Sequence, residues 1–357
     1  MALLNLLAVN SGSSSLKAAL FLKDGSRRNF AYHHSNDPEE AFDSLIRDTR
    51  DAQPDLVGHR FVHGGEIPDS ARIVDAAEFS RLESLVPLAP LHLPGNLLGI
   101  ELCTKHFDAP QIACFDTSFH STMPEIAKRL PVPGRIRRYG FHGLNYAHIA
   151  KRLPKILGEA AHGKVVAAHL GSGASLCLMD DLESRDTSMG YSPAGGIVMG
   201  TRCGDLDPGA MLELCRIHGL EALTDLVYHG MGLLALSSGE SAEMKQLLSS
   251  NTKQAKFSVQ YFCREVSGKI GSFAAKAGGI DALVFSGGIG EHSPKVREMV
   301  TKPLGFMGFR LDREANEAGL EIISSADSKP VLVLSADEEA EIFDLCLSIA
   351  GPYVSCQ

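Results

Sequence analysis

The sequence predicts an α/β protein made of two related domains, each a mixed β-sheet flanked by helices. The first observation behind this prediction is a glycine- and serine-rich hairpin that occurs twice, at residues 6–17 and 165–176. Each copy consists of an apolar strand, a tight turn and a second apolar strand. The second observation is that three strands followed by alternating helices and strands also occur twice. With 357 residues, the chain is long enough for two domains and a large core.

Short apolar runs bounded by turn residues predict the strands of the first half, and helical periodicity predicts its helices. Strands are expected at residues 3–9, 16–22, 29–33, 56–62 and 111–115. Helices are expected at 38–50 and 94–106, the second beginning at Pro94, because proline is favoured in the first turn of a helix. We expect the junction between the two domains near residues 116–124.

The second half repeats the opening arrangement of three strands. After a helix at 146–157, strands are expected at 164–169, 175–180 and 183–187. A helical stretch is expected from 207 to about 250, and then a long helix at 254–277, whose apolar positions recur at three and four residues. Strands at 281–285 and 331–334 and helices at 294–300 and 338–349 complete the prediction.

Composition excludes several classes of function. The net charge of −9 disfavours nucleic acid or an anionic membrane as a partner, so an anionic substrate needs a local cluster of arginine and lysine. The eight cysteines show neither a CxxC pair nor zinc spacing, which favours reduced thiols in a cytoplasmic protein. We expect no signal peptide and no transmembrane segment, because the chain starts in a strand pattern and no apolar run is long enough.

The turns of the two hairpins are suited to phosphate. Glycine lets the backbone approach a ligand closely, and serine hydroxyls and backbone N–H groups in such a turn complement phosphate oxygens. Two copies indicate a protein that contacts a phosphorylated ligand from two sides. The segment 286–291 also follows a strand and precedes a helix, and this arrangement offers N–H groups to a nucleotide.

Three weaker motifs are set aside. Residues 158–164 have P-loop spacing, but Val165 stands where serine or threonine must bind magnesium, and the segment precedes a strand. Residues 230–235 match GxGxxA but follow a helical segment, so they lack the Rossmann context. His59 and His63 lie four apart on a predicted strand, where structural or substrate-contacting histidines are favoured over metal ligands.

Two arginines are candidates for binding an anion. Arg60 ends an apolar strand just before a pair of glycines, and Arg202 lies in a loop rich in glycine and acids. A guanidinium beside such a backbone suits bidentate contact with carboxylate or phosphate, and the alternative is an ordinary Arg–Asp ion pair. The basic run at residues 135–138 is instead predicted to be a solvated turn.

Three carboxylates are well placed for chemistry. Asp116 ends a buried strand, and ligands of open α/β sheets bind at the carboxyl ends of strands. Glu338 and Glu339 follow a strand and start a helix, where they either complement the helix dipole or reach magnesium through water.

Taken together, these segments resemble the acetate and propionate kinase family, whose fold is shared by sugar kinases, Hsp70 and actin. The match runs nearly end to end, and a sugar kinase would lack the segments 58–66 and 199–208. The matching segments are residues 10–17, 58–66, 90–92, 115–123, 138–143, 169–175, 186–190, 199–208, 285–294 and 337–339.

The resemblance implies two actin-like (ribonuclease H-like) domains with a cleft between them that closes around substrates. The first domain comprises residues 1–118 and the returning helix 340–357, and the second, nucleotide-binding domain comprises residues 119–339. The implied reaction is reversible transfer of the γ-phosphoryl group of ATP to acetate, with Mg²⁺ or Mn²⁺, in a cytoplasmic homodimer. In-line positioning and compensation of charge are what such a transfer requires.

Residue by residue, the resemblance implies the following roles. Arg60, Arg202 and His142 hold the carboxylate and the transferring phosphoryl group, and Asp116 orients Arg60. Asn10 and Glu338 help to place the metal. The pocket for the alkyl group and the active-site lining are formed by Val62, Leu91, His92, Phe141 and Pro193. Valine at position 62 limits the depth of the pocket, which favours acetate over propionate.

The nucleotide side is implied to contain eleven residues, namely Lys17, His169, Gly171, Ser172, Gly173, Glu243, Lys245, Gly288, Ile289, Gly290 and His292. Three of them depart from the family pattern, which has asparagine at positions 172 and 292 and arginine at 245. A lysine cannot stack on a purine or form a planar fork as arginine does, so Lys245 bears on the choice of donor.

Two alternatives stay open. One is a related enzyme that acts on propionate or uses pyrophosphate as donor. The other is a nucleotide-binding switch of the Hsp70 or actin kind, which would not need a pair of carboxylate-binding arginines.

Overall fold

The computed structural model describes residues 4–12, 15–33 and 38–354, and the chain divides into two compact units. Unit 1 falls in the ranges Met1–Ser121, Phe141–His148 and Asp337–Gln357, and unit 2 in Thr122–Gly140 and Ile149–Ala336. The expected domain boundaries at 118/119 and 339/340 stay predictions. Residue 3 of the first predicted strand and residues 13–14 of the first hairpin lie outside the described residues.

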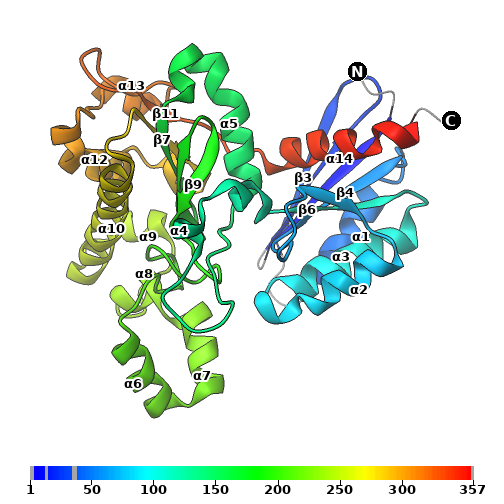
Figure 1. Ribbon diagram of the computed structural model, residues 1–357, viewed down its shortest axis with the longest axis horizontal. Helices are drawn as coiled ribbons and strands as arrows, with labels where there is room; N and C mark the ends of the chain where they lie inside the picture. The colour runs from blue at the N-terminus through cyan, green and yellow to red at the C-terminus, as the bar shows by residue number, and fades with distance from the viewer. Residues whose placement is uncertain (1–3, 13–14, 34–37, 355–357) are drawn as a thin grey trace. The chain divides into compact units, whose positions relative to one another are not determined.

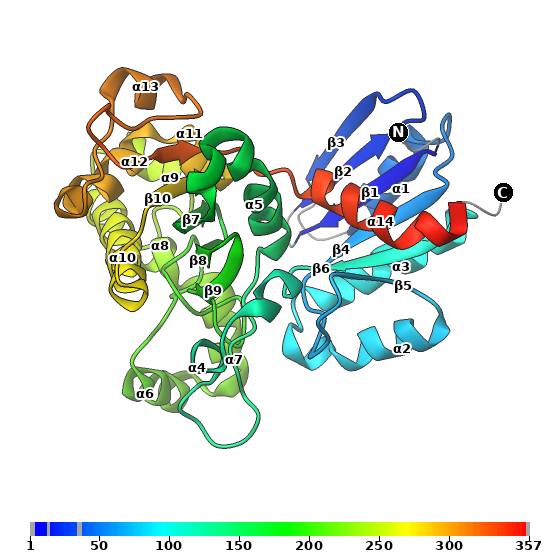
Figure 2. The same cartoon turned by 45° about the horizontal axis from the view of Figure 1, so that its top comes forward.

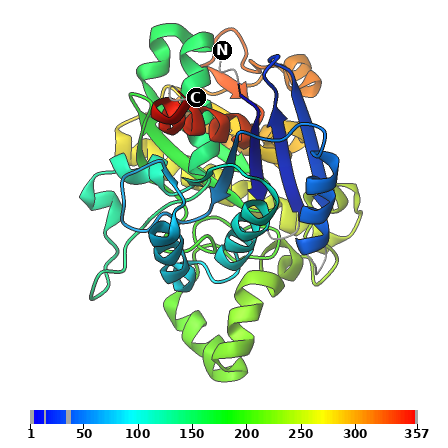
Figure 3. The ribbon, with the colours of Figure 1, turned by 90° about the vertical axis from the view of Figure 1, so that its right-hand side faces the viewer.

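Unit 1 is built on a six-stranded mixed sheet with the order β3-β2-β1-β4-β6-β5. The strands are β1 (Leu6–Ser11), β2 (Ser15–Phe21), β3 (Arg27–His33), β4 (Leu56–Phe61), β5 (Ala71–Ile73) and β6 (Gln111–Phe115). The first three pair antiparallel and lie side by side in Figure 3, whereas β4 runs parallel to β1 and to β6. The carboxyl ends of β1, β4 and β6 therefore meet at one edge of the sheet.

Helices cover both faces of this sheet (Figure 1). Leu7 and Val9 of β1 pack with residues of α1 (Pro38–Asp48) and α3 (Leu93–His106). Leu6 and Ala8 point to the other face and pack with α14 (Glu338–Val354). The burial of successive residues on opposite faces explains why β1 is apolar throughout. Helix α2 (Ala76–Ser84) lies beside α3, and α5 (Gly143–Leu157) starts in unit 1 and ends in unit 2.

Unit 2 contains a five-stranded sheet with the order β11-β10-β7-β8-β9 (Figure 2). The strands are β7 (Lys164–Leu170), β8 (Ala174–Asp180), β9 (Glu183–Thr187), β10 (Ala282–Ser286) and β11 (Val331–Val333). Three antiparallel strands are again followed by two parallel ones, as in β3-β2-β1-β4-β6 of unit 1. The predicted duplicated α/β fold is confirmed.

The longest helix of unit 2 is α10 (Lys253–Ala277). The Thr252 hydroxyl accepts from the Ala255 amide at its start, and Gly278 ends it in a left-handed conformation. The remaining helices of this unit are α4 (Glu125–Lys128), α6 (Pro208–His218), α7 (Leu220–Asp225), α8 (Gly232–Leu236), α9 (Met244–Ser249), α11 (Gly287–His292), α12 (Pro294–Thr301) and α13 (Arg313–Ala318).

The structure refines some local predictions and adds elements that were missed. The stretch 207–250 is broken into α6, α7, a π-helical turn (Leu226–Gly230), α8 and α9. One break is at Gly232, whose φ is +70° and whose added Cβ would lie 2.2 Å from the Met199 carbonyl oxygen. The segment 286–291, which was predicted to precede a helix, itself forms most of α11, and β5, α2 and α13 were missed. The short β5 offers too few residues for a periodic pattern.

One further local prediction was confirmed. The segment 158–164 does precede a strand, β7, which supports setting aside its P-loop spacing. Among the residues described, none of the helices combines the length and the apolar character that crossing a membrane requires.

Two glycines of unit 1 test how tightly α14 packs on the sheet. A Cβ added to Gly58 of β4 would lie 2.4 Å from Cys346 Sγ and 2.5 Å from Ile342 Cγ2, whereas one added to Gly95 of α3 meets open space. We expect Gly58→Ala to destabilise the protein by about 1–3 kcal/mol through overpacking. Gly95→Ala should stabilise it by up to about 1 kcal/mol. Urea denaturation of both variants checks this, and equal effects would contradict the packing described.

Candidate active site

The centre of the candidate site is an arginine bound to a buried aspartate. Arg60, near the end of β4, donates to Asp116 Oδ2 from Nε (2.9 Å) and from Nη2 (2.6 Å). Asp116 follows β6, is inaccessible to solvent and donates its own amide to the Phe61 carbonyl. The parallel pairing of β4 with β6 thus sets both side chains at the same sheet edge. The predicted ion pair exists, and its position at strand ends is also the one that a binding site requires.

Two further carboxylates and an amide adjoin this pair. The Asn10 side-chain amide, at the end of β1, donates to Glu338 Oε2 (2.7 Å) and to Glu339 Oε1 (3.0 Å). Its oxygen accepts from Arg60 Nη1 in a long contact of 3.4 Å. Glu338 Oε2 also lies 3.6 Å from Arg60 Nε. Sequence reasoning predicted Asn10, Arg60, Asp116 and Glu338, and the fold brings all four together.

The charges of this cluster shift its pKa values. Burial raises the pKa of Glu339, and the neighbouring charge of Glu338 raises it further. Burial also raises the pKa of Asp116, which the Arg60 guanidinium opposes. Although burial would lower the pKa of Arg60, the carboxylates of Asp116, Glu338 and Glu339 raise it above its usual value. Arg60 therefore stays charged among more acidic groups than it can neutralise.

The start of α14 is held in place by an interaction that sequence reasoning missed. Arg27 of β3 forms a bidentate pair with Asp337 (2.6 and 2.9 Å). Asp337 Oδ1 also accepts from the Ala340 amide at 3.0 Å and so caps the helix. The pair fixes the backbone immediately before Glu338. No short motif identifies it, because Arg27 and Asp337 are 310 residues apart.

The residues of unit 1 that are predicted to bind the substrate's alkyl group come from three separate segments, which follow β4, precede α3 and precede α5. Val62 is buried, and its amide donates to Asn96 Oδ1 (3.0 Å). The buried Phe141 packs edge-on against His63. His63 lies beyond β4 rather than on the predicted strand, and its Nδ1 accepts from the Gly65 amide. Leu91 is 41% exposed, and His92 precedes α3.

The segment that contains His142 is held tightly against Asp116. The Gly143 amide donates to the Asp116 carbonyl (3.0 Å), and a Cβ at Gly143 would lie 2.0 Å from that oxygen. The Leu144 amide lies 3.4 Å from Asp116 Oδ1. His142 has a φ of +58°, which is uncommon for a non-glycine residue and is often found at functional sites. The strand end, the glycine and His142 thus form one rigid arrangement.

Arg202 belongs to unit 2, in a loop fixed at both ends. Its Nη1 donates to the carbonyl of Pro193, another predicted site residue, at 2.7 Å. The Leu233 and Leu234 amides of α8 donate to the Met199 and Gly200 carbonyls. Asp205, on the far side of Arg202, accepts from the Gly196 amide at 2.7 Å. The arginine is therefore presented from an ordered backbone.

The predicted nucleotide-side residues of unit 2 lie at or beside one turn and on two short helices. Gly171, Ser172 and Gly173 form the turn between β7 and β8, closed by a Gly171–Gly173 hydrogen bond, and His169 precedes it on β7. Gly288, Ile289, Gly290 and His292 lie on α11. Glu243 and Lys245 are exposed at the start of α9. Lys17 belongs to unit 1, where β2 places it opposite Asn10.

Two arginines of unit 2 have structural roles that the sequence did not reveal. Arg138, predicted to lie in a solvated turn, donates from Nη1 to the carbonyls of Thr187, Ser188 and Met189, so that prediction was wrong for this residue. The buried Arg297 donates to the Gly290 and Glu291 carbonyls and so holds the end of α11. A single charged residue in a helix pattern gives no signal for such a role.

The donor set of unit 1 suits a hard cation. Asn10, Glu338 and Glu339 offer amide and carboxylate oxygens, the ligands that Mg²⁺ prefers. Burial, and after it the charge of Glu338, raises the pKa of Glu339, so two acidic side chains lie close together in a buried place. Within the described part of the chain, no group of three or more His, Cys, Asp or Glu side chains has the arrangement of a complete metal site. Asn10, Glu338 and Glu339 therefore suit a metal ion that takes its remaining ligands from outside this group of residues.

Comparison with known proteins gives a consistent result. A model of the acetokinase family matches residues 28–344. The acetate kinase of Rhodopseudomonas palustris (strain ATCC BAA-98 / CGA009) is 40% identical, with 91% of this chain and 92% of the relative covered. The acetate kinase of Methylocella silvestris is 44% identical over 82% of this chain and 74% of its own.

Solved structures agree with these sequence relatives. The acetate kinase of Entamoeba histolytica superposes with a TM-score of 0.86 at 30% identity, covering 97% of this chain and 99% of that one. A propionate kinase from Francisella tularensis also has a TM-score of 0.86, at 29% identity over 96% and 98% of the two chains.

Because His59 is buried, we expect the stability of the protein to depend on pH. Burial lowers its pKa to about 4, although a hydrogen bond with Gln111 opposes the shift. Between about pH 6.5 and 4 the unfolded chain binds a proton here that the folded protein does not, so stability falls as the pH falls. The loss amounts to about 3 kcal/mol.

Denaturation at pH 7 and 4.5 checks this prediction with two variants. His59→Gln should lose most of this pH dependence, whereas His162→Gln, at an exposed histidine that contacts Asp181, should retain it. An unchanged pH dependence in His59→Gln would be incompatible with a buried neutral imidazole.

Proposed function

The chain belongs to the acetokinase family, and from that premise we propose that it transfers the γ-phosphoryl group of ATP to acetate and catalyses the reverse reaction. The observation that carries the proposal is Arg60, held by a buried aspartate at the edge of the sheet. Its Nη1 has a long contact of 3.4 Å with Asn10 and can donate to a substrate oxygen. Asp116 keeps the guanidinium in a fixed orientation.

The proposed chemistry is direct transfer. A carboxylate oxygen of acetate attacks the γ-phosphorus, the new O–P bond forms opposite the bond to the β–γ bridging oxygen, and ADP leaves with that electron pair. Because acetate is itself the nucleophile, the step needs neither a protein nucleophile nor a proton transfer. Arg60, Arg202 and His142 compensate the negative charge that spreads over the equatorial oxygens.

We propose Mg²⁺ as the metal and Asn10 and Glu338 as the residues that hold it, with Glu339 beside them. When bound, Mg²⁺ neutralises charge on the donor phosphates. The oxygen donors and the raised pKa of Glu339 support this assignment. A cation here would also relieve the repulsion between Glu338 and Glu339.

We propose ATP as the donor and the nucleotide-side residues as its site. The turn at residues 171–173 and the first residues of α11 support this, because backbone amides at such turns suit phosphate. Ser172, Lys245 and His292 depart from the family pattern, so the assay below also includes pyrophosphate.

Two further proposals concern the assembly and its location. We propose a homodimer, and the exposed apolar side chains of α6 and α7, which include Leu212, Ile217 and Leu220, support an apolar contact. We propose a cytoplasmic location, supported by free thiols at seven described cysteines. The mass of the protein in solution tests the first proposal, and fractionation of cells tests the second.

Trapping of acyl phosphate with hydroxylamine tests the proposed function. Acetate and propionate are each supplied with ATP or pyrophosphate, with and without Mg²⁺. Product with ATP, acetate and Mg²⁺ supports the proposal, and product with pyrophosphate alone would overturn the choice of donor. If the folded protein yields no product in any combination, a nucleotide switch replaces the enzyme.

Arg202 is expected to be essential for transfer. Arg202→Ala should lower kcat by at least about 100-fold, because it removes charge compensation from the transition state, while circular dichroism stays unchanged. The control is Arg216→Ala, at an exposed arginine of α6 that pairs with Glu213. An Arg202→Ala protein with near wild-type kcat would exclude the assigned role.

Val62 is expected to set the preference between acids. Val62→Ala enlarges the pocket, and the ratio of kcat/KM for propionate to that for acetate should rise by about tenfold. Val57→Ala is the control, because Val57 is a buried valine of β4, the strand that precedes Val62, and packs in the core with α1 and α3. An equal change of the ratio in both variants would show that Val62 does not limit the pocket.

A further inference from the structure

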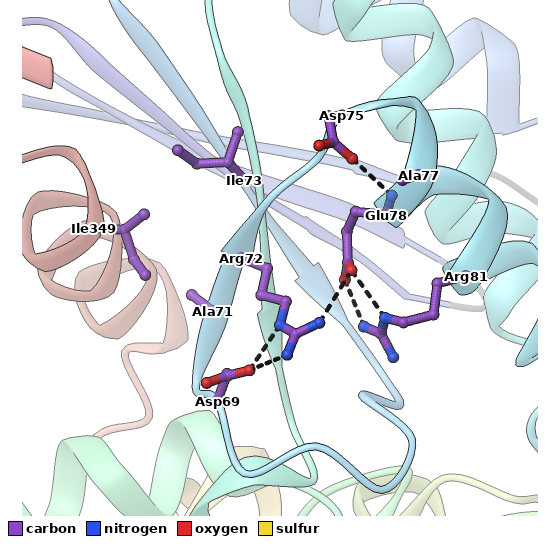
Figure 4. Close-up of a pocket in the computed structure, with 9 residues that line it drawn as sticks. All are labelled: Asp69, Ala71, Arg72, Ile73, Asp75, Ala77, Glu78, Arg81 and Ile349. Atoms are coloured by element: carbon purple, nitrogen blue, oxygen red, sulfur yellow. Dashed lines mark hydrogen bonds and ion pairs between the residues drawn. The ribbon is translucent and has the colours of Figure 1, made fainter.

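Arg81 contacts the loop that follows β4, and it also lines an open hollow on unit 1 (Figure 4). This loop, residues 62–66, connects the predicted substrate pocket to the rest of the unit. Arg81 of α2 donates from Nη1 to the Gly64 carbonyl at 2.7 Å. Its guanidinium also lies over the ring of Phe115, with Cζ 5.6 Å from the ring centroid. Phe115 is the residue immediately before Asp116.

The Arg81 side chain has little freedom to move. Glu78 accepts from its Nε (2.9 Å) and Nη2 (2.5 Å), which leaves Nη1 for the loop. Glu78 is itself buried, and its amide donates to the capping residue Asp75 at 2.7 Å. The start of α2 therefore fixes the carboxylate, and the carboxylate fixes the guanidinium. A bidentate pair of this kind imposes direction as well as attraction.

The 62–66 loop is equally constrained where Arg81 meets it. The Gly64 amide donates to Thr117 Oγ1 at 3.0 Å, and a Cβ at Gly64 would lie 2.9 Å from the Phe115 ring. The backbone of Gly64 is thus held between Arg81 and the segment that carries Asp116. Val62 lies two residues before this contact. A displacement of Gly64 would therefore move both Val62 of the predicted pocket and Asp116, which pairs with Arg60.

We propose that Arg81 is a positioning residue for the acceptor carboxylate, which it serves by holding the 62–66 loop against Phe115. This inference rests on the proposed function of the site. Arg81 acts on substrate binding through Val62 and Asp116 and does not itself touch the reacting atoms. Loss of the contact should weaken the binding of acetate and leave the binding of ATP unchanged, because the predicted nucleotide residues, Lys17 apart, belong to unit 2.

The same hollow supplies a matched control. Arg72 also contacts Glu78, at 3.4 Å, and pairs with Asp69, but no contact links it to Gly64. Arg72→Ala removes an arginine from the same network while leaving the loop contact intact. Arg81→Ala removes the loop contact, and Glu78→Gln weakens the support of Arg81 with a side chain of the same size.

Two measurements on the full chain test the proposal. In steady-state kinetics, Arg81→Ala should raise the KM for acetate by about tenfold and change the KM for ATP by less than twofold, with Glu78→Gln showing a smaller shift and Arg72→Ala none. In hydrogen exchange without substrate, the amides of residues 62–66 should exchange faster in Arg81→Ala and not in Arg72→Ala.

The outcomes separate this inference from the proposed function. Unchanged exchange in Arg81→Ala and Glu78→Gln, or an equal increase in Arg72→Ala, would overturn the positioning role. Faster exchange with an unchanged KM for acetate would overturn the link to the substrate. If the wild-type protein forms no acyl phosphate, the proposed function fails and with it the link to acetate, and the exchange data still decide whether Arg81 holds the loop.

Discussion

The site of unit 1 depends on the pairing of Arg60 with Asp116 at the ends of two adjacent parallel strands. The register of β4 with β6 sets Phe61 opposite Phe115, so the residues that flank this pair are aligned by backbone hydrogen bonds. A carboxylate that is inaccessible to solvent is tolerated only when it is hydrogen bonded and paired, and Arg60 supplies two such bonds. Gly143 has no side chain because its backbone must reach the carbonyl of this same aspartate.

Three carboxylates surround one arginine in this site, and their charge dominates its electrostatics. The carboxylates of Asp116, Glu338 and Glu339 all raise the pKa of Arg60. Burial and the nearby charge of Glu338 raise the pKa of Glu339. Such a cluster disfavours an anionic substrate unless a cation accompanies it. In the proposed reaction, a metal that accompanies the phosphate donor would offset this charge.

The two units use one strand order for different purposes. In unit 1 the ends of β1, β4 and β6 carry Asn10, Arg60 and Asp116, which are polar or charged. In unit 2 the corresponding edge carries the glycine turn after β7 and the glycine-rich start of α11 after β10. The edge of a parallel sheet suits both arrangements, because strand ends converge there whatever side chains they carry. Duplication thus provided two scaffolds, and the residues at the strand ends set their chemistry.

The sequence by itself determined most of the strands and helices and the positions of Arg60 and Asp116 at strand ends, because these depend on local periodicity and on short segments such as 58–66. It also located Glu338 at the start of a helix, whereas Asn10 was assigned a role only through resemblance to a family. Tertiary structure decided which distant residues support them: Arg27 holds Asp337, Arg81 holds Gly64, and Arg297 holds α11. These supports join residues that are far apart in the chain or bind backbone carbonyls, which every residue possesses. A pattern of side chains therefore carries no signal for them, and only the folded backbone brings the partners together.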